Sequence, residues 1–294
     1  LEITRMSTGA HGNRPTRNQQ REAARAKAKE LREQQNKNEK RRKLFLQGGI
    51  GLAVIAIAAI FTLTIASSAP KEGPRPANMA SDGIVLSGAN MAGVLSDAGS
   101  STVAIEVYQD YLCPACKAFD EANSQQLQTL VEAGAATLEL HPIGMLANQS
   151  AGTKYSLRSQ AAAACVANYS PDTFWKVNQA FYANQPQEGT PGLNDEEITA
   201  LIDAQKPQNQ SKIDKCIKDK TFMPWASQAT DYALAGPMTQ AAKDSGAAGV
   251  GTPTILVNGK VYTGSIVDAK EFLAFITQVA GESASTTPAT PAAG

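Results

Sequence analysis

The sequence predicts an α/β domain with a central mixed sheet, in which a helical segment is inserted between a βαβ half and a ββα half. Strand-like runs lie near the two ends of 83–282, whereas helical periodicity dominates from about 148 to 246. A close cysteine pair, Cys113 and Cys116, stands between the first strong strand and the first helix. The uncharged run 44–66 precedes the domain and predicts one N-terminal transmembrane helix.

The N-terminal segment 1–43 is basic, although the net charge of the 294-residue chain is zero. The run 44–66 is long enough to cross a hydrocarbon core of about 30 Å as a helix rising about 1.5 Å per residue. Positive charge precedes this run and no comparable cluster follows it, so we expect 1–43 to be cytoplasmic and the domain to lie outside the cell membrane. We favour an uncleaved anchor over a cleaved signal peptide. For the basic segment 1–43 we favour a role in setting topology over the binding of nucleic acid or anionic lipid.

Two segments of low complexity flank the predicted domain. Residues 67–82 are rich in proline and small polar residues and predict an extended linker. Residues 283–294 lack the apolar surface needed to fold and predict a disordered tail. We therefore assign the chemistry to 83–282, and expect this domain to act as a monomer.

The first half of the domain is predicted to form a βαβ unit. A short strand is expected at 83–86, and a stronger one at 102–108, where apolar residues alternate with others. Helical spacing of apolar residues covers 116–132 and stops at Gly134. A second strand at 136–140 completes the unit.

The second half is predicted to contain a run of helices followed by a hairpin and a last helix. The helical signals cover, in order, 159–167, 171–183, 195–204, 211–218 and 226–243. Strands at 254–257 and 260–263, joined by the turn signal Asn258-Gly259, predict a β-hairpin. Apolar periodicity over 268–279 predicts the closing helix.

The motif Cys113-Pro114-Ala115-Cys116 lies where a strand ends and a helix begins. Backbone N–H groups and the helix dipole favour a thiolate at that point, so we expect the pKa of Cys113 to be lowered. Cys116 follows one turn later, close enough to form a small disulfide ring. We predict that Cys113 exchanges disulfides with a substrate and that Cys116 resolves the mixed disulfide.

Three other uses of this motif are less well supported. Zinc binding would need Cys165 and Cys216 as further ligands, but these do not form a second close-spaced pair, so we predict no metal site. A purely structural disulfide within the motif would close a ring too short to restrict the unfolded chain much. Papain-like catalysis lacks an identifiable base, because His141 is more simply explained as a residue at a strand end.

Cys165 and Cys216 both fall in predicted helices of the insertion. A disulfide between them fits an oxidising compartment and closes a long loop, which is worth about 4 kcal/mol on the chain-entropy model. We predict a structural disulfide. The alternative is a pair of buried free thiols.

The linear order of these features resembles the DsbA-like branch of thioredoxin-fold thiol-disulfide oxidoreductases. The matching features are a strand, Asp110-x-x-Cys113-Pro114-Ala115-Cys116, a helix, a strand, a helical insertion, Gly251-Thr252-Pro253-Thr254, a hairpin and a final helix. The resemblance covers about 83–279 and implies a thioredoxin fold. In that family a cis-proline loop opposes the redox motif, and Thr252-Pro253 matches it. The resemblance thus implies that Pro114, Ala115, Thr252 and Pro253 contact the substrate.

The resemblance also implies a function outside the cytoplasm. The expected enzyme introduces disulfides into unfolded or exported cysteine-containing proteins, needs no cofactor, and is reoxidised by a membrane redox partner. A reductase or isomerase of the same fold is the first alternative. A thioredoxin-fold binding protein without catalytic turnover is the second.

The sequence departs from the family pattern in two places. Many relatives have a buried carboxylate six residues before the first cysteine, but Val107 stands there, and strand alternation places Glu106 on the opposite face. Ala115 replaces the histidine of the strongly oxidising members, which implies a milder oxidant. Because Val107 cannot accept a proton, proton transfer at Cys116 would use water or another group.

Overall fold

The computed structural model describes residues 73–79, 81–88, 91–94 and 103–286, together with Glu22, Lys29, Glu33 and Lys37. The fold lies in the compact unit that runs from Lys71 onward. The predicted membrane segment 44–66 lies outside the described residues. Within those described, no helix is both long enough and apolar enough to cross a membrane.

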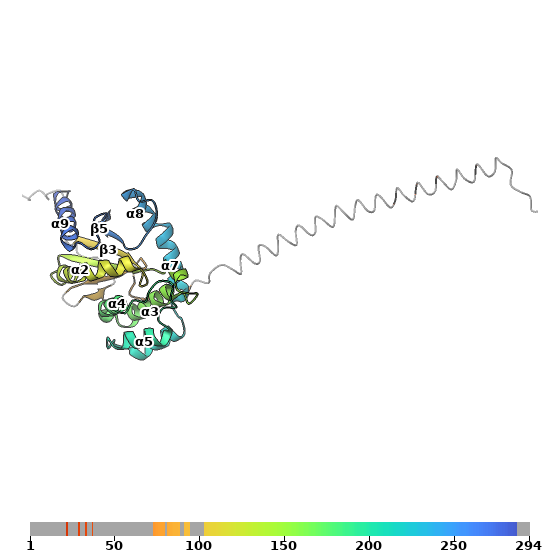
Figure 1. Ribbon diagram of the computed structural model, residues 1–294, viewed down its shortest axis with the longest axis horizontal. Helices are drawn as coiled ribbons and strands as arrows, with labels where there is room; N and C mark the ends of the chain where they lie inside the picture. The colour runs from red at the N-terminus through yellow and green to blue at the C-terminus, as the bar shows by residue number, and fades with distance from the viewer. Residues whose placement is uncertain are drawn as a thin grey trace, which may run out of the picture. The chain divides into compact units, whose positions relative to one another are not determined.

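A six-stranded mixed sheet forms the centre of the domain, in the order β2-β1-β4-β3-β5-β6 (Figure 1). The strands are β1 (Ile84–Ser87), β2 (Ala92–Val94), β3 (Val103–Gln109), β4 (Ala136–Pro142), β5 (Thr254–Val257) and β6 (Lys260–Val261). β3 and β4 are parallel, and every other adjacent pair is antiparallel. The predicted mixed sheet is confirmed. β2 was not predicted, because three residues are too few to show an alternating pattern.

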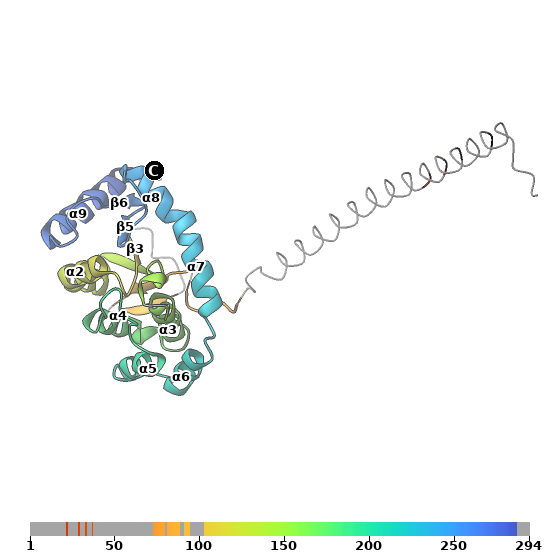
Figure 2. The same cartoon turned by 45° about the vertical axis from the view of Figure 1, so that its right-hand side comes forward.

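Helices cover the sheet and make up the insertion. They are α2 (Pro114–Glu132), α3 (Tyr155–Tyr169), α4 (Phe174–Ala183), α5 (Asp195–Asp203), α6 (Gln210–Lys218), α7 (Met223–Ala235), α8 (Pro237–Ser245) and α9 (Ala269–Thr286), with short 3-10 turns at Ala147–Gln149 and Pro171–Thr173. Figure 2 shows α3 to α6 grouped together, and α7 leading from this group to α8 beside β5 and β6. α2 and α9 pack together, with the rings of Phe119 and Phe272 5.4 Å apart.

The helix predicted over 226–243 is two helices in the structure. α7 ends at Ala235 and α8 begins at Pro237, with Gly236 between them at φ −107° and ψ −101°. Proline lacks the N–H group that a continuing helix needs, and it disfavours the helical conformation of the residue before it. The single-helix prediction was therefore wrong.

α9 continues beyond the predicted end at Val279, to Thr286. It thereby enters the segment 283–294, for which the sequence predicts a disordered tail. The four residues 283–286 at the start of that segment are therefore helical, and 287–294 lie outside the described residues.

The described part of the predicted linker 67–82 makes hydrogen bonds to the domain. The backbone N–H of Ala77 donates to Asn168 Oδ1 at 2.7 Å, and Trp225 Nε1 donates to Asp82 Oδ1 at 2.8 Å. The described part of this segment is therefore attached to α7 and to the end of α3. These partners lie far away in the sequence, so local composition gave no sign of them.

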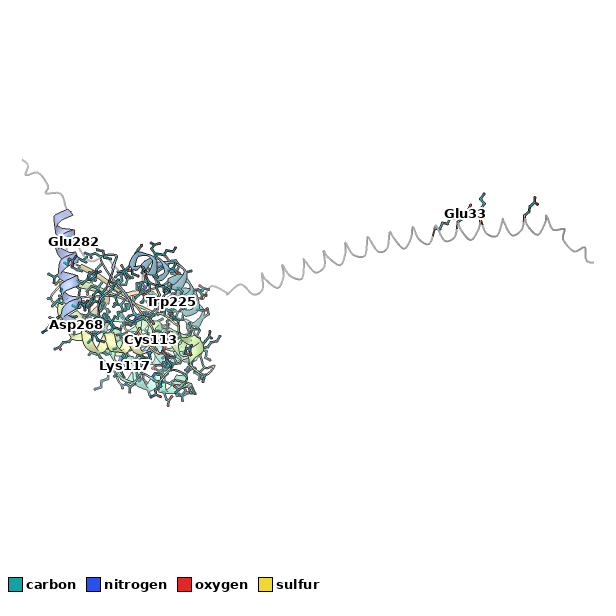
Figure 3. All side chains as sticks on the ribbon, turned by 45° about the horizontal axis from the view of Figure 1, so that its top comes forward. Glu33, Cys113, Lys117, Trp225, Asp268 and Glu282 are labelled. Atoms are coloured by element: carbon teal, nitrogen blue, oxygen red, sulfur yellow. A yellow bond between two sulfur atoms is a disulfide. The ribbon has the colours of Figure 1, made fainter. Side chains whose placement is uncertain are left out.

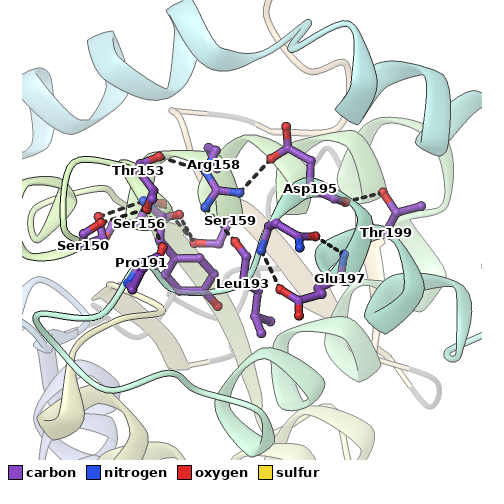
Figure 4. A network of polar contacts seen from close by, with 12 residues as sticks. Ser150, Thr153, Ser156, Arg158, Ser159, Pro191, Leu193, Asp195, Glu197 and Thr199 are labelled. Atoms are coloured by element: carbon purple, nitrogen blue, oxygen red, sulfur yellow. Dashed lines mark hydrogen bonds and ion pairs between the residues drawn. The ribbon is translucent and has the colours of Figure 1, made fainter.

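Arg158 of α3 fixes the start of α5 within the insertion (Figure 4). Its guanidinium donates to Asp195 Oδ1 at 2.7 Å and to the Leu193 carbonyl oxygen at 2.6 Å. Asn194 and Glu197 form a capping box at the start of α5, which satisfies two backbone N–H groups. Polar contacts therefore position this part of the insertion on α3.

Candidate active site

The candidate site lies between the end of β3 and the start of α2. Figure 3 labels Cys113, the first cysteine of this site. Cys113 is the N-cap residue of α2, and Pro114 occupies the first turn, where its missing N–H costs no helical hydrogen bond. Cys113 and Cys116 are free thiols. Cys113 is 7% exposed and Cys116 is 1% exposed, so an incoming sulfur reaches Cys113 more easily.

The surroundings of Cys113 lower its pKa to about 6. A hydrogen bond from the Cys116 thiol makes the largest contribution. Burial opposes it, while hydrogen bonds from the Thr252 side chain and from the backbone of Cys116 and Ala115 lower the pKa further. In its neutral form the Cys113 thiol donates to the Thr252 carbonyl oxygen at 3.3 Å. At neutral pH Cys113 is therefore mainly a thiolate, the form that exchanges disulfides.

The pKa of Cys116 is raised well above its usual range. Burial is the main cause, followed by the hydrogen bond to Cys113 and the repulsion of its charge. The backbone N–H of Asp110 donates to Cys116 Sγ at 3.5 Å, which partly offsets these effects. Cys116 is thus a protonated thiol next to a thiolate.

The loop that contains Thr252 and Pro253 faces the redox motif, and the peptide bond between them is cis. A hollow of about 460 Å³ opens beside it, lined by Ala115, Thr252 and Pro253 together with residues of α8 and the β6 region. Pro114 is exposed at the start of α2 but does not line this hollow. Three of the four residues expected to contact a substrate thus border one open space.

A family model described as "Thioredoxin" matches residues 98–278, more than half of the chain. The chain belongs to the thioredoxin family. No protein of curated function matches the sequence.

Solved structures of DsbA-type proteins share the fold of this thioredoxin-family chain. Reduced DsbA from Mycobacterium tuberculosis has a TM-score of 0.54 at 22% identity, covering 70% of this chain and 98% of that one. The reduced disulfide bond oxidoreductase DsbG from the same organism gives 0.53 at 23% identity, covering 71% and 95%. BdbD from Bacillus subtilis gives 0.52 at 18% identity, covering 71% and 97%. The predicted DsbA-like thioredoxin fold is confirmed.

The expected lack of a carboxylate under the redox motif is visible in the structure. Val107 is fully buried in β3. Glu106 is paired in register with Glu139 of β4, and its pKa is raised by burial and then by the charge of Glu139. Its neighbours are thus Glu139 and His141, whereas neither cysteine affects its pKa.

Asp110 is a buried acid of the site that the sequence analysis included in the family motif but gave no role. Its side chain is fully buried, and its two oxygens accept from the backbone N–H groups of Leu112 and Leu146, each at 2.8 Å. Burial raises its pKa to about 6, against the lowering effect of these hydrogen bonds. An aspartate placed directly after a strand is typical of a side-chain-stabilised turn, and this signal could have identified it.

Gln185, just after α4, is a second residue that was missed. Its Nε2 donates to the carbonyl oxygens of Cys113 at 3.0 Å and Tyr111 at 3.2 Å, and so holds the redox loop of this thioredoxin-family domain. No local pattern predicts this contact, because Gln185 lies 72 residues from Cys113. Within the described parts of the chain, no group of three or more His, Cys, Asp or Glu side chains is arranged to hold a metal.

Proposed function

We propose that this thioredoxin-family chain forms disulfides in cysteine-containing proteins by exchange through Cys113 and Cys116. The observation that carries the proposal is that the pKa values of two thiols one helical turn apart are shifted in opposite directions. The pKa of Cys113 is lowered to about 6, and the pKa of Cys116 is raised well above its usual range. A thiol of lower pKa leaves a disulfide faster. Cys113 is therefore suited to leave a mixed disulfide, and Cys116 to remain a thiol.

The proposed cycle starts from a Cys113–Cys116 disulfide. A substrate thiolate attacks Cys113 Sγ, and Cys116 leaves with the electron pair of the broken S–S bond and takes up a proton. A second substrate thiolate then attacks the substrate sulfur of the mixed disulfide, and Cys113 leaves as a thiolate. The substrate has lost two electrons and the enzyme has gained them, so a membrane redox partner must reoxidise the enzyme.

The Thr252-Pro253 loop supports binding of an extended substrate segment. The Thr252 carbonyl oxygen lies 3.3 Å from Cys113 Sγ, so a peptide linked to that sulfur would pass close to this backbone. Extended peptides commonly bind through main-chain hydrogen bonds of this kind. The adjoining hollow offers space for a side chain next to the substrate cysteine.

Trapping of mixed disulfides tests the proposed reaction. The Cys116→Ala variant lacks the resolving thiol, so substrate proteins should accumulate on Cys113 in cells and appear as reducible adducts by mass spectrometry. Cys113→Ala is the matched control and should trap none. If Cys116→Ala also traps nothing, the chain is better explained as a binding protein without turnover.

Reduction or isomerisation of disulfides is the alternative to disulfide formation. Ala115 borders the hollow where strongly oxidising relatives have a histidine, which favours a milder oxidant, a reductase or an isomerase. Equilibration with glutathione buffers measures the reduction potential of the Cys113–Cys116 pair. A value near or below about −270 mV, that of thioredoxin, would exclude the oxidase.

The proposed location is the outer side of the cell membrane, with 44–66 as the anchor and the domain acting as a monomer. The uncharged run and the basic segment before it support this placement. A membrane-impermeant maleimide should label Cys113 in intact, mildly reduced cells. Labelling that requires cell lysis would place the domain in the cytoplasm instead.

A further inference from the structure

We propose that Gln185 is a positioning residue for the exchange reaction: it holds the loop before α2 so that the hydrogen-bond donors of the first helical turn face Cys113 Sγ. The inference rests on the proposed function, because it concerns the same two cysteines. Gln185 acts through the backbone, since its hydrogen bonds end on carbonyl oxygens and not on a sulfur. This role gives the helical insertion a part in the reaction.

Gln185 holds both ends of a short turn. Its Nε2 donates to the carbonyl oxygen of Tyr111 at 3.2 Å and to that of Cys113 at 3.0 Å. An amide nitrogen carries two N–H donors, so the two bonds use both of them. In the same turn, the N–H of Cys113 donates to the Asp110 carbonyl oxygen at 3.0 Å. Rotation of either peptide unit would therefore break a hydrogen bond to Gln185.

The orientation of the Cys113 carbonyl decides how α2 begins. Cys113 is the N-cap residue, in the extended conformation, and its side chain makes no capping hydrogen bond. Its carbonyl oxygen also accepts from the N–H of Lys117 at 3.2 Å, in the first turn of the helix. Because the peptide unit is planar, a fixed carbonyl also fixes the plane through which the chain enters the helix at Pro114.

The donors that stabilise the Cys113 thiolate come mainly from that first turn. The largest effect is the hydrogen bond from the Cys116 thiol, and the backbone N–H groups of Cys116 and Ala115 contribute further. The Thr252 side chain adds a hydrogen bond from the opposing loop. Hydrogen bonds weaken steeply when the donor is misaligned. Loss of Gln185 should therefore weaken several of these bonds together.

Two other polar contacts of the loop do not replace Gln185. Asn178 Oδ1 accepts from the Tyr111 hydroxyl, and Asp110 Oδ1 accepts from the N–H of Leu112. Both groups act as acceptors, whereas the loop carbonyls need donors. Removal of the Gln185 amide therefore removes a restraint that these two residues do not supply.

The segment that carries Gln185 is itself fixed within the insertion. The N–H of Gly189 donates to the Gln149 carbonyl oxygen at 2.7 Å. The guanidinium of Arg158 donates to the Leu193 carbonyl oxygen at 2.6 Å (Figure 4). Positioning side chains need such support, because a loosely held group cannot keep its partner in one geometry. Gln185 thus connects the redox loop to a segment anchored on α3.

The full-length variant Gln185→Met tests this role, because methionine is similar in length but has no donor. Its reduced form should lose part of the thiolate stabilisation. The equilibrium with glutathione should therefore shift about tenfold toward the Cys113–Cys116 disulfide, which lowers the reduction potential by about 30 mV. The rate of alkylation of Cys113 by iodoacetamide, measured against pH, should also show a midpoint above the wild-type value of about 6.

Two further variants separate positioning from stability. Gln187→Met is the matched control, since it makes the same chemical change at an exposed position of the same segment, and it should keep the wild-type midpoint and potential. Gln185→Glu places an acceptor against two carbonyl oxygens, so it should shift both quantities further than Gln185→Met. A side chain that only stabilised the fold would stabilise the oxidised and reduced protein alike, and its loss would leave the potential unchanged.

The outcomes distinguish this inference from the proposed function. A wild-type midpoint and potential in Gln185→Met, or an equal shift in Gln187→Met, overturns the role of Gln185 while the exchange reaction stands. A wild-type cysteine pair that does not equilibrate with glutathione overturns the exchange itself. If Gln185→Met does not fold, Gln185→Asn serves instead: it keeps the amide but is too short to reach both carbonyls, so the same shifts are expected, and unshifted values overturn the proposal.

Discussion

Cys113 owes its low pKa chiefly to a neutral neighbour. The largest effect is the hydrogen bond from the Cys116 thiol, followed among the lowering effects by the Thr252 side chain and the first backbone N–H groups of α2. Hydrogen bonds account for each of these main lowering effects. The thiolate therefore depends on short-range hydrogen bonds, which the replacement of a histidine by Ala115 does not remove.

Removal of the Cys116 thiol should consequently raise the pKa of Cys113. We expect the midpoint of thiolate formation in Cys116→Ala to rise from about 6 toward the ordinary value of 9.0, as measured by thiolate ultraviolet absorbance against pH. Lys117→Ala is the control, because that side chain pairs with Glu121 and should leave the midpoint unchanged. An unchanged midpoint in Cys116→Ala would contradict the assigned cause.

The lowered pKa of Cys113 also makes the stability of the reduced protein depend on pH. Because the folded state ionises Cys113 at a lower pH than the unfolded chain does, the unfolded chain holds more protons between about pH 6 and 9. The reduced protein should therefore gain stability as pH rises through this window, and lose it as pH falls through about 6. Urea unfolding of the reduced wild type and of Cys113→Ala should show this slope only in the wild type.

Asp120 should act on stability in the opposite sense. Burial raises its pKa to about 7 from 3.8, so the folded state holds more protons than the unfolded chain between these values. Stability from this group falls as pH rises through the window. Asp120→Asn keeps an oxygen that can accept from Gln179. It should be more stable than the wild type at pH 8, by on the order of 2 kcal/mol, and equal to it near pH 4 in urea unfolding.

At the scale of elements, the features that the sequence predicted were those with a local cause. Alternation in 102–108 predicted β3, and turn chemistry at Asn258-Gly259 predicted the hairpin. The break at Gly236-Pro237 also had a local signal, which the apolar periodicity on both sides obscured. Gln185 had no local signal, because its partners are the backbone carbonyls of Tyr111 and Cys113, which only folding brings close to it.

α4 positions the redox loop through a single buried amide. Asn178 Oδ1 accepts from Gln109 Nε2 at 2.5 Å and from the Tyr111 hydroxyl at 3.1 Å. Asn178→Ala should leave both buried donors unpaired and lower the free energy of unfolding by about 3 kcal/mol. Urea unfolding measures the loss, and Lys176→Ala, an exposed position on the same helix, should change little. Equal effects of the two variants would contradict this role for α4.

At the scale of the whole molecule, three distant parts of the chain assemble the site. The start of α2 supplies both thiols, the Thr252-Pro253 loop supplies the facing backbone, and the segment just after α4 supplies the amide of Gln185. The sequence identified the first two because each has a motif. The helical insertion thus supports the catalytic loop through contacts that a linear motif does not encode.

The disulfide between Cys165 and Cys216 joins α3 to α6 within that insertion, across a separation of 51 residues. On the chain-entropy model, a loop of this length stabilises the fold by about 4 kcal/mol. The double variant Cys165→Ala/Cys216→Ala should lose about this much in urea unfolding. The pKa of Cys113 should stay near 6, since neither residue contributes to it. The matched control is the wild type with only the Cys113–Cys116 pair reduced, which should retain the stability due to this disulfide. A double variant as stable as the wild type would show that packing of α3 on α6 suffices without the covalent link.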